Sequence, residues 1–403
     1  MKTIALAFRY LWSRPLAALL NLLLLTLGLA SITFVLLASE QIDRAFQRDL
    51  AGIDLVVGAK GSPMQLILAG VFHIDVPPGN IPLSEVEALR RQPQVKQLIP
   101  LSLGDSFRGF RIVGTNADYL AHYRLAPAQG RAWTGPMEAL LGAQVARATG
   151  MKAGDSFVGS HGLAGGGQGH ADHPYRIAGV LAPCGCAADR LILTATESVW
   201  EMHEVHAKPG AAHDDDPKQE EARREVTMAL ITYNSPLAAV SFPRYVNSST
   251  GMQAAAPAVE VSRLLRMLGV GSEVLRGFGA VLLLTAALSV FIALWNAVRE
   301  RRADLAMLRM LGAPPAKVAA LLLCEAWWLA LIASVLGLAG GHALTALVGA
   351  LLEAQRSLPV TGRIWVAAEA WIPAAALSVA TLAALIPAVS AYRVDVAQLL
   401  NAR

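Results

Sequence analysis

The sequence predicts a membrane protein with four transmembrane α-helices and a large α+β extracytoplasmic domain, which stands on a helical stalk between helices 1 and 2. Three observations carry this prediction. Hydrophobic residues make up 54% of the 403 residues and charged residues 16%, whereas soluble domains average about 45–50% and about 25%. Four apolar runs reach the length of about 20 residues that a bilayer requires. Short β-rich runs fill the long segment between the first two of them.

The same composition excludes other classes of protein. A disordered chain has too few apolar residues to offset the entropy of ordering, whereas this chain has an excess of them. The formal net charge of +4 is too small and too scattered for a nucleic-acid-binding surface, so no nucleic acid is expected as a partner. Three cysteines cannot form a disulfide framework in so long a chain. The extracytoplasmic domain must therefore hold its own core.

The four apolar runs divide the chain into nine segments. The first two runs carry no charge, the third contains Glu325, and the fourth contains Pro387. The first run exceeds the 7 to 15 residues of a signal-peptide core, so it is expected to be a retained anchor. The predicted order is 1–14 cytoplasmic, 15–38 membrane, 39–277 extracytoplasmic, 278–298 membrane, 299–317 cytoplasmic, 318–348 membrane, 349–370 extracytoplasmic, 371–389 membrane and 390–403 cytoplasmic.

The orientation follows from lysine and arginine residues near the ends of the runs. Segments 1–14 and 299–317 are rich in them, and segment 349–370 balances them with glutamates. Because short cytoplasmic segments carry the excess of positive charge, both termini are expected on the cytoplasmic side. Aromatic residues near the ends of the runs are typical of membrane interfaces; they are Trp12, Trp295, Trp327, Trp328, Trp365, Trp371 and Tyr392.

The extracytoplasmic segment predicts an α+β fold between two stalk helices. The stalks are expected at 39–50 and 259–275, where apolar residues recur at helical spacing. Strands are expected at 54–59, 95–101, 110–115, 175–182, 190–195 and 228–233, and helices at 83–92 and 138–150. Segments 160–172 and 208–224 are expected to be loops. The apolar segment 60–75 is either a surface for an apolar substrate or partner, or a buried helix.

Four stretches of the chain resemble one known family. The stretch ALWNAVRERRADLAMLRMLGAPPAKVAALLLCEAWWLAL resembles the loop between spans 2 and 3 of FtsX-like, MacB-type ABC transporter permeases, whose ERR-D/E-hydrophobic-x-x-LR-x-LGA motif is matched by residues 299–313. The start LAFRYLWSRPLAALLNLLLLTLGLA and the tail LIPAVSAYRVDVAQLL are similar to the family's ends. LGAQVARATGMKAGDSF is similar to its MacB-like periplasmic core domain.

The resemblance implies an inner-membrane permease subunit of a bacterium, with a periplasmic outer domain and a separate ABC ATPase as partner. It implies a dimer with a second permease chain, identical or different, surrounded by membrane lipid. The residues implied to couple the chain to the ATPase are Arg299, Glu300, Arg301, Arg302, Asp304, Leu305, Leu308, Arg309, Leu311 and Gly312. Leucines would supply the apolar contacts and arginines the charge. A loop that only sets topology would explain the arginines, but not the leucine spacing or LGAPP.

The expected function is to couple ATP hydrolysis by that ATPase to movement of the periplasmic domain, for export or extraction of a lipoprotein, lipid, peptide or hydrophobic small molecule. The alternative is a scaffold that transports nothing and regulates a periplasmic partner such as a cell-wall hydrolase. The chain lacks the G-x-x-x-x-G-K-[ST] pattern of a phosphate loop, so it is not expected to be the hydrolysing enzyme. No cofactor or catalytic set is expected.

Three further patterns have open interpretations. Small residues at four-residue spacing let helices approach closely, within one chain or between subunits; they are Ala333, Gly337, Gly341, Ala376, Ala380 and Ala384. Glu325 is either a functional intramembrane carboxylate or one at headgroup level. The histidines of the outer domain match no established metal-site spacing, and Cys184 and Cys186 could pair, bind metal or stay free.

Overall fold

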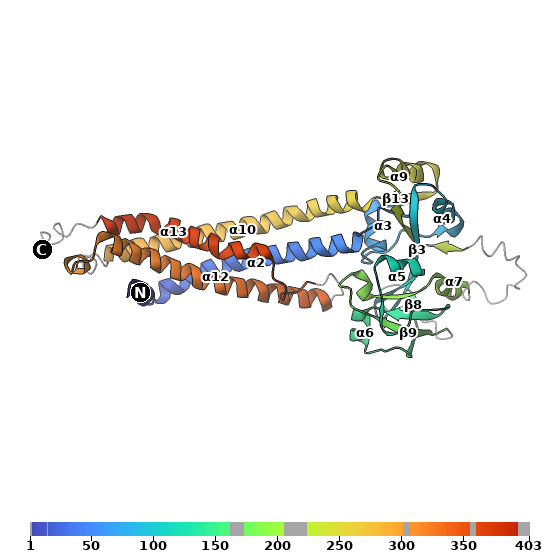
Figure 1. The fold of residues 1–403 in the computed structure, drawn as a ribbon, viewed down its shortest axis with the longest axis horizontal. Coiled ribbons are helices and arrows are strands. Elements are labelled where there is room, and N and C mark those ends of the chain that lie inside the picture. Colours follow the sequence, from blue (N-terminus) through green and yellow to red (C-terminus); the bar gives the residue numbers. More distant parts are fainter. Residues whose placement is uncertain are drawn as a thin grey trace, which may run out of the picture. The chain divides into compact units, whose positions relative to one another are not determined.

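The computed structural model divides into two compact units (Figure 1), which we describe separately. The helical domain comprises Met1–Asp43 and Met267–Arg403, and the α/β domain comprises Arg44–Arg266. The structure describes residues 2–13, 15–161, 173–204, 224–300, 307–354 and 360–393.

Four helices of the described chain are long and apolar enough to cross a membrane. They are α2 (Pro15–Leu50), the Gly277–Glu300 part of α10 (Pro257–Glu300), α12 (Pro315–Ala354) and α13 (Trp371–Tyr392). The 36 residues of α2 extend about 54 Å, well beyond the roughly 30 Å of a hydrocarbon core. Five charged residues lie between Glu40 and Asp49. The helix therefore continues past its charge-free part, as the expected stalk requires.

Small residues allow the long helices to pack closely. A Cβ atom at Gly337 of α12 would lie 2.6 Å from Cβ of Leu29 on α2, and one at Gly341 would overlap Cβ of Thr33. Only glycine therefore fits where these two backbones meet. Both predicted stripes of small residues are buried within this chain. The stripe on α12 consists of Ala333, Gly337 and Gly341, and the stripe on α13 consists of Ala376, Ala380 and Ala384.

Polar side chains also join the helices of this domain. Ser289 on α10 donates a hydrogen bond to Asn21 on α2 at 2.5 Å. The indole of Trp327 on α12 donates to Thr381 on α13 at 2.9 Å. Because lipid offers no alternative partner, such bonds specify which helix faces meet. Glu325 is buried within the helical domain.

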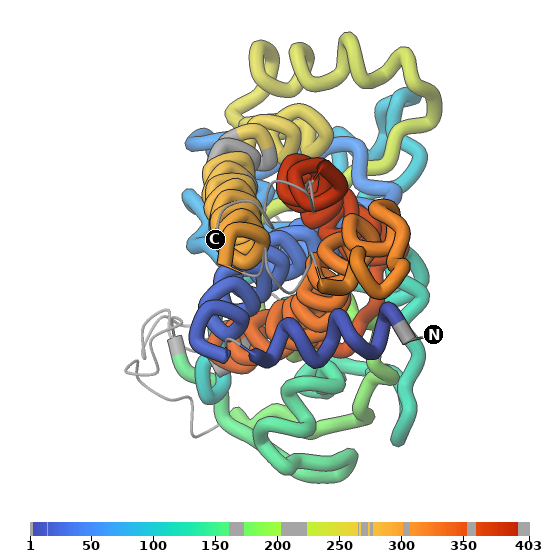
Figure 2. Tube along the Cα trace, turned by 90° about the vertical axis from the view of Figure 1, so that its left-hand side faces the viewer, coloured from blue at the N-terminus to red at the C-terminus, as the bar shows by residue number. Residues whose placement is uncertain are grey.

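The first helix, α1 (Lys2–Leu11), lies across α12 (Figure 2). Its Phe8 ring meets the Trp328 ring at a centroid distance of 5.2 Å, and the Trp328 indole donates to the carbonyl of Ile4 at 3.2 Å. These contacts hold the N-terminal segment against the half of α12 that follows the α10–α12 connection.

Polar contacts anchor the connection between α12 and α13, which contains the short helix η2 (Ala367–Ala370). The amide of Gln41 on α2 exchanges two hydrogen bonds with the backbone of Thr361, at 2.9 and 2.8 Å. His342 on α12 contacts the Gly362 carbonyl at 2.7 Å and the Glu369 carboxylate at 2.9 Å. The connection is thus fastened to two different helices.

The α/β domain is built on an 11-stranded mixed sheet whose main path is β13-β1-β12-β3-β4-β10-β6-β9-β5. The strands are β1 (Leu55–Ala59), β2 (Ile81–Pro82), β3 (Val95–Phe107), β4 (Phe110–Thr115), β5 (Pro127–Gly130), β6 (Glu138–Leu141), β7 (Ser156–Phe157), β8 (Ser160–His161), β9 (Tyr175–Leu181), β10 (Leu191–Ala195), β11 (Glu225–Val226), β12 (Met228–Tyr233) and β13 (Met252–Ala255). The long strand β3 pairs first with β12 and then with β4, so it connects the two halves of the sheet.

Each half of the sheet has its own hydrophobic core. One core centres on Leu55, Ile231 and Phe242, and the other on Ile112, Leu141 and Ile192. Helices α4 (Leu83–Arg90) and α9 (Ala238–Ser249) contribute to the first core, and α6 (Ala143–Thr149) and α7 (Thr196–Glu204) contribute to the second. The domain also contains α3 (Pro63–Gly70), α5 (Ala117–His122) and the short helix η1 (Ala187–Arg190). The domain therefore holds itself together without a disulfide framework.

Two expectations for this domain are resolved by burial. Within the segment 60–75, residues Pro63–Gly70 form helix α3, in which Leu66 and Ile67 are inaccessible to solvent, so the central part of the segment is a buried helix and not an exposed apolar path. The single helix expected at 138–150 is wrong, because its first four residues form β6 between β10 and β9. A Cβ atom at Gly142 would overlap the Ala188 carbonyl oxygen, so only glycine fits where the chain turns before α6 begins.

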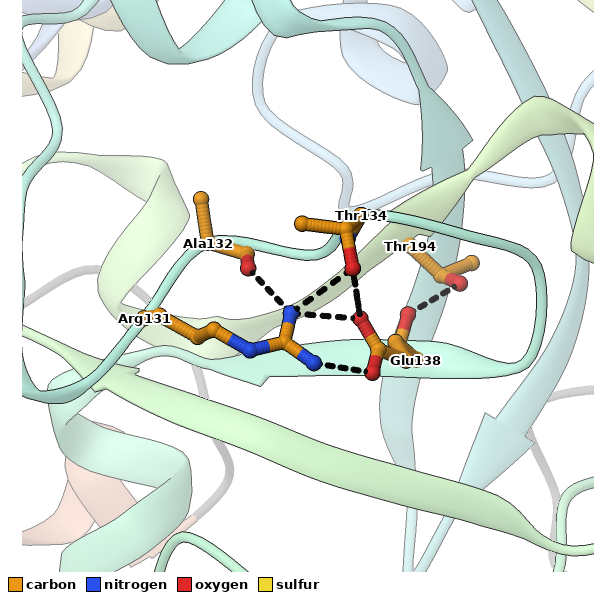
Figure 3. Close-up of polar contacts among 5 residues, drawn as sticks. All are labelled: Arg131, Ala132, Thr134, Glu138 and Thr194. Carbon is orange, nitrogen blue, oxygen red and sulfur yellow. Dashed lines mark hydrogen bonds and ion pairs between the residues drawn. The ribbon is translucent and has the colours of Figure 1, made fainter.

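An ion pair closes the loop that leads into β6 (Figure 3). The guanidinium of Arg131 donates to both carboxylate oxygens of Glu138, at 2.7 and 2.5 Å. The backbone N–H of Thr134 also donates to Glu138, at 2.8 Å. The pKa of Glu138 is lowered to about 2, and the hydrogen bond from Arg131 is the main cause. On the other side, the Thr194 hydroxyl of β10 donates to the Glu138 carbonyl at 2.8 Å.

Candidate functional site

The connection between α10 and α12 carries the coupling residues that the sequence predicts. Helix α10 ends with Arg299 and Glu300, both exposed. Four of the predicted residues, Arg301, Arg302, Asp304 and Leu305, lie outside the described residues. The chain is described again from residue 307, where one helical turn precedes α12.

The turn that follows is a Schellman motif centred on Gly312. The N–H of Ala313 donates to the Leu308 carbonyl, and that of Gly312 donates to the Arg309 carbonyl, both at 3.0 Å. These are the two bonds that close a helix whose next residue has a left-handed conformation, and Gly312 has φ +91°. Pro315 then begins α12, where its missing N–H and fixed φ suit the first turn. This explains the sequence LGAPP.

The turn presents a compact apolar surface, which we call the coupling turn (residues 307–313). Leu311 is 85% exposed, Met310 55% and Met307 53%. Leu308 is partly buried and packs against the hydrophobic core of the helical domain. Leu308 therefore anchors the turn, while Met307, Met310 and Leu311 face outward. The two methionines were not among the predicted contact residues.

The charges flanking the coupling turn are mostly positive. Arg299 and Glu300 precede it, Arg309 lies half-buried within it, and Lys317 is exposed in the first turn of α12. Exposed apolar side chains with a cationic rim suit a protein partner that offers an apolar groove with acidic edges.

A second cluster, not predicted from the sequence, holds the C-terminal end of α2 inside the α/β domain. Asp49 is 3% exposed, and its carboxylate accepts a hydrogen bond from the Ala187 N–H at 3.0 Å. Its backbone carbonyl accepts one from the Tyr123 hydroxyl at 2.9 Å. The neighbouring Arg48 side chain donates to the carbonyl of Gly185. We call residues 184–190 the anchor turn, because it receives the last turn of α2.

Burial dominates the electrostatics of Asp49. Asp49 lies beyond the charge-free part of α2, within the α/β domain. Desolvation raises the pKa of its carboxyl to about 6, against the opposing effects of the Ala187 N–H and of Arg190 and Arg48. One signal in the sequence pointed toward this contact, namely the charges that interrupt the apolar pattern after residue 39, but their partner was not indicated.

Cys184 and Cys186, in the anchor turn, form a disulfide with a Cα–Cα distance of 5.1 Å. Within the described residues, no group of three or more His, Cys, Asp and Glu residues is arranged to hold a metal ion. Of the histidines considered for metal binding, His170, His206 and His213 lie outside the described residues. The metal-binding interpretation therefore remains a prediction about those segments.

The described chain thus combines four apolar helices, a capped turn between the second and third of them, and an α/β domain inserted after the first. The family described as FtsX-like permease C-terminal matches residues 276–396. The family described as MacB-like periplasmic core domain matches residues 18–227, more than half of the chain. The chain belongs to the FtsX- and MacB-like ABC permease family, and its α/β domain is the periplasmic core domain. The predicted family and fold class are confirmed.

Solved structures include similar domains at low sequence identity. The periplasmic region of MacB from Actinobacillus actinomycetemcomitans is 13% identical with a TM-score of 0.35, covering 54% of this chain and 95% of that one. The extracellular domain of the noncanonic ABC-type transporter YknZ from Gram-positive bacteria is 14% identical with a TM-score of 0.30, covering 50% and 98%. A comparison with curated proteins gave no significant match.

Proposed function

We propose that this chain is a permease subunit that receives mechanical work from a separate ATPase through the coupling turn and delivers it to the periplasmic domain. The observation that carries the proposal is the exposure of Met307, Met310 and Leu311 on a turn anchored by Leu308. Such a surface at the end of two membrane helices is costly in water unless a partner covers it. Membership in the family implies that an ATPase is this partner.

The proposal includes an orientation and an assembly. Both termini and the coupling turn lie on the cytoplasmic side, because Lys2, Arg9 and Arg14 precede α2 and Lys317 begins α12. ATP is hydrolysed by the partner, and two permease chains, identical or different, form the membrane part of the complex. The chain itself supplies no hydrolytic chemistry.

The cargo is proposed by class, as a lipoprotein, lipid, peptide or hydrophobic small molecule taken from the periplasm or the membrane. Nucleotide-driven closure of the ATPases would displace the coupling turn, tilt α10 and α12, and move the periplasmic domain through the stalks. A scaffold that regulates a periplasmic protein would use the same movement. Accumulation of an untransported cargo in cells lacking the chain supports transport, whereas copurification of a cell-wall hydrolase supports the scaffold.

The docking part of the proposal is tested with purified components. The chain would be expressed with its ATPase, reconstituted in nanodiscs, and compared with a variant carrying Met307→Asp, Met310→Asp and Leu311→Asp. Ile364→Asp, at an exposed residue of the α12–α13 connection, serves as the control. We expect the triple variant to lose at least tenfold in ATPase affinity while the control binds normally. Normal binding by the triple variant would contradict the docking assignment.

Leu308 is deliberately left unchanged in this design. Its side chain packs against the hydrophobic core of the helical domain, so a charge there would disturb folding as well as docking. A loss of binding in Leu308→Asp would therefore not identify a contact residue. The variant with three outward-facing substitutions separates the two effects.

A further inference from the structure

The anchor turn contains a disulfide whose two cysteines differ in exposure. Cys184 is half-buried, whereas Cys186 is only 7% exposed. Around Cys184, the residues Ala182, Pro183 and Gly185 are all exposed. Gly185 has φ +65° and no side chain to cover the neighbouring sulfur. Of the two cysteines, Cys184 is therefore the more accessible to a thiol from outside.

The disulfide is poorly suited to a purely structural role. Its two cysteines are separated by a single residue. The stabilisation that a disulfide provides by restricting the unfolded chain grows with the length of the closed loop, and this loop is close to the shortest possible. The two cores of the domain are formed by other residues. The position of the bond, rather than its contribution to chain entropy, requires an explanation.

That position is the junction between α2 and the sheet. Asp189 accepts hydrogen bonds from the N–H groups of Cys184 at 3.0 Å and Gly185 at 2.7 Å, which fixes the fold of the anchor turn. The anchor turn also presents the Gly185 carbonyl to Arg48 and the Ala187 N–H to Asp49. Every one of these groups lies within five residues of the disulfide or at the end of α2.

We propose that Cys184–Cys186 is a thiol–disulfide exchange site for a dithiol protein of the periplasm, and that its reduction loosens the anchor turn from α2. The periplasmic location places the pair where disulfides form and where proteins with exchangeable dithiols operate. Accessible disulfides are the ones that such proteins reduce. The proposal does not depend on the coupling turn or on the ATPase.

The exchange is a balanced two-electron reaction. A thiolate of the dithiol protein attacks Cys184 Sγ, the Cys184–Cys186 bond breaks, and Cys186 leaves as a thiolate that takes up a proton. The second thiol of the dithiol protein then attacks its own sulfur in the mixed disulfide and releases Cys184. The dithiol protein ends as a disulfide, and the chain has gained two electrons and two protons.

The anchor turn has a place for the reduced form. Cys184 Sγ lies 3.4 Å from Asp189 Oδ1. In the disulfide, sulfur and carboxylate face each other without a proton between them, whereas the reduced thiol can donate its S–H to that oxygen. The carboxylate would then be shared between the thiol and the N–H groups of Cys184 and Gly185. The carboxylate can accept all three bonds, so reduction loosens the turn by removing the covalent link between residues 184 and 186 and not by breaking these hydrogen bonds.

The test uses the full chain in nanodiscs, with Cys324→Ser to remove the free cysteine in the helical domain. The sample is equilibrated with dithiothreitol in graded ratios of reduced to oxidised form, and separately with reduced thioredoxin. Alkylation and mass measurement count the free thiols. We expect both cysteines to become alkylated together under conditions in which the fold persists. Thiols that are free in oxidising buffer, or a bond that resists both reductants until the chain unfolds, would overturn the proposal.

Hydrogen exchange of the same samples tests the structural consequence. We expect amides of residues 44–50 and 184–190 to exchange at least tenfold faster after reduction, with little change in β12. The variant with Cys184→Ser and Cys186→Ser should behave like the reduced protein. If that variant does not fold, the reduced parent still provides the comparison. Unchanged exchange in the reduced parent would overturn the loosening, and neither result would affect the ATPase-docking experiment.

Discussion

The carboxylate of Asp49 accepts a hydrogen bond from the backbone N–H of Ala187 at 3.0 Å, which joins the last turn of α2 to the turn that precedes β10. Helix α2 runs from Pro15 to Leu50, so the two domains share this helix. Its end is held by a buried carboxylate and an arginine rather than by apolar packing alone. The attachment should therefore respond to pH and to single substitutions.

The stability of the periplasmic domain should fall as the pH rises through about 6. Burial raises the pKa of Asp49 to about 6 from 3.8, so the folded state binds this proton more tightly than the unfolded state. The stabilisation of the folded state by protonated Asp49 is therefore complete below pH 3.8 and is lost as the pH rises above 6. An amide side chain does not titrate, so the stability of Asp49→Asn should not carry this pH dependence. The free energy of unfolding of the variant minus that of the parent should therefore rise by up to roughly 3 kcal/mol from pH 4 to pH 7. Urea unfolding followed by hydrogen exchange in β4 and β10 measures this, and a pH-independent difference would contradict it.

Glu138 should show the opposite pH dependence. Its pKa is lowered, chiefly by the hydrogen bond from Arg131, so its contribution is present above pH 4.5 and is lost as the pH falls toward 2. Glu138→Gln should be less stable than the parent at pH 5, and the gap should close toward pH 2.5. Glu87→Gln, which removes an exposed ion pair with Arg90 on α4, controls for general charge effects. A gap that stays constant with pH would refute the assignment.

Close packing of α2 against α12 should make adjacent glycines respond differently to the same substitution. A Cβ at Gly341 would overlap Thr33 Cβ, whereas one at Gly340 would make an ordinary 3.4 Å contact with Ala30. Gly341→Ala should cost about 1–3 kcal/mol because the backbones must separate. Gly340→Ala should be neutral or mildly stabilising. Unfolding of both variants in mixed detergent micelles measures the difference, and equal stability would argue against this packing.

Gly312 should be required for its backbone conformation alone. It has φ +91°, and no described atom lies within 4 Å of a Cβ added there. Gly312→Ala should destabilise the coupling turn by about 1–2 kcal/mol and weaken ATPase binding up to roughly tenfold. Gly312→Asn should recover part of the affinity, because asparagine tolerates the left-handed region. Titration of the ATPase onto nanodisc-embedded variants would show this order, and equal affinities would exclude a conformational role.

Much of the fold was predictable because its signals are local. Long apolar runs predicted the four long helices, and short apolar runs bounded by turn residues predicted strands such as β4 and β12. Strand β6 was missed because Glu138–Leu141 precedes a helical pattern without a break in the sequence, and only burial between β9 and β10 makes it a strand. Long-range pairing of this kind has no local signature.

The site was predictable only in part, for similar reasons. The spacing of Leu305, Leu308 and Leu311 predicted one apolar face, but the Schellman turn directs Leu308 inward and Leu311 outward. The pairing of Cys184 with Cys186 depends on a turn fixed by Asp189, and the sequence left three alternatives open. The contact between Asp49 and Ala187 spans 138 residues, so no motif could have revealed it.

The most direct test of the central claim is whether nucleotide bound by the ATPase changes the periplasmic domain through the coupling turn. Hydrogen exchange would be measured on the reconstituted complex with and without ATP and vanadate, for the parent and for the variant with Met307, Met310 and Leu311 changed to aspartate. Protein concentrations would be raised until the variant also binds its ATPase. We predict a nucleotide-dependent change in residues 44–50 of the parent that is absent from the variant. The same change in both proteins, or none in the parent, would contradict the account.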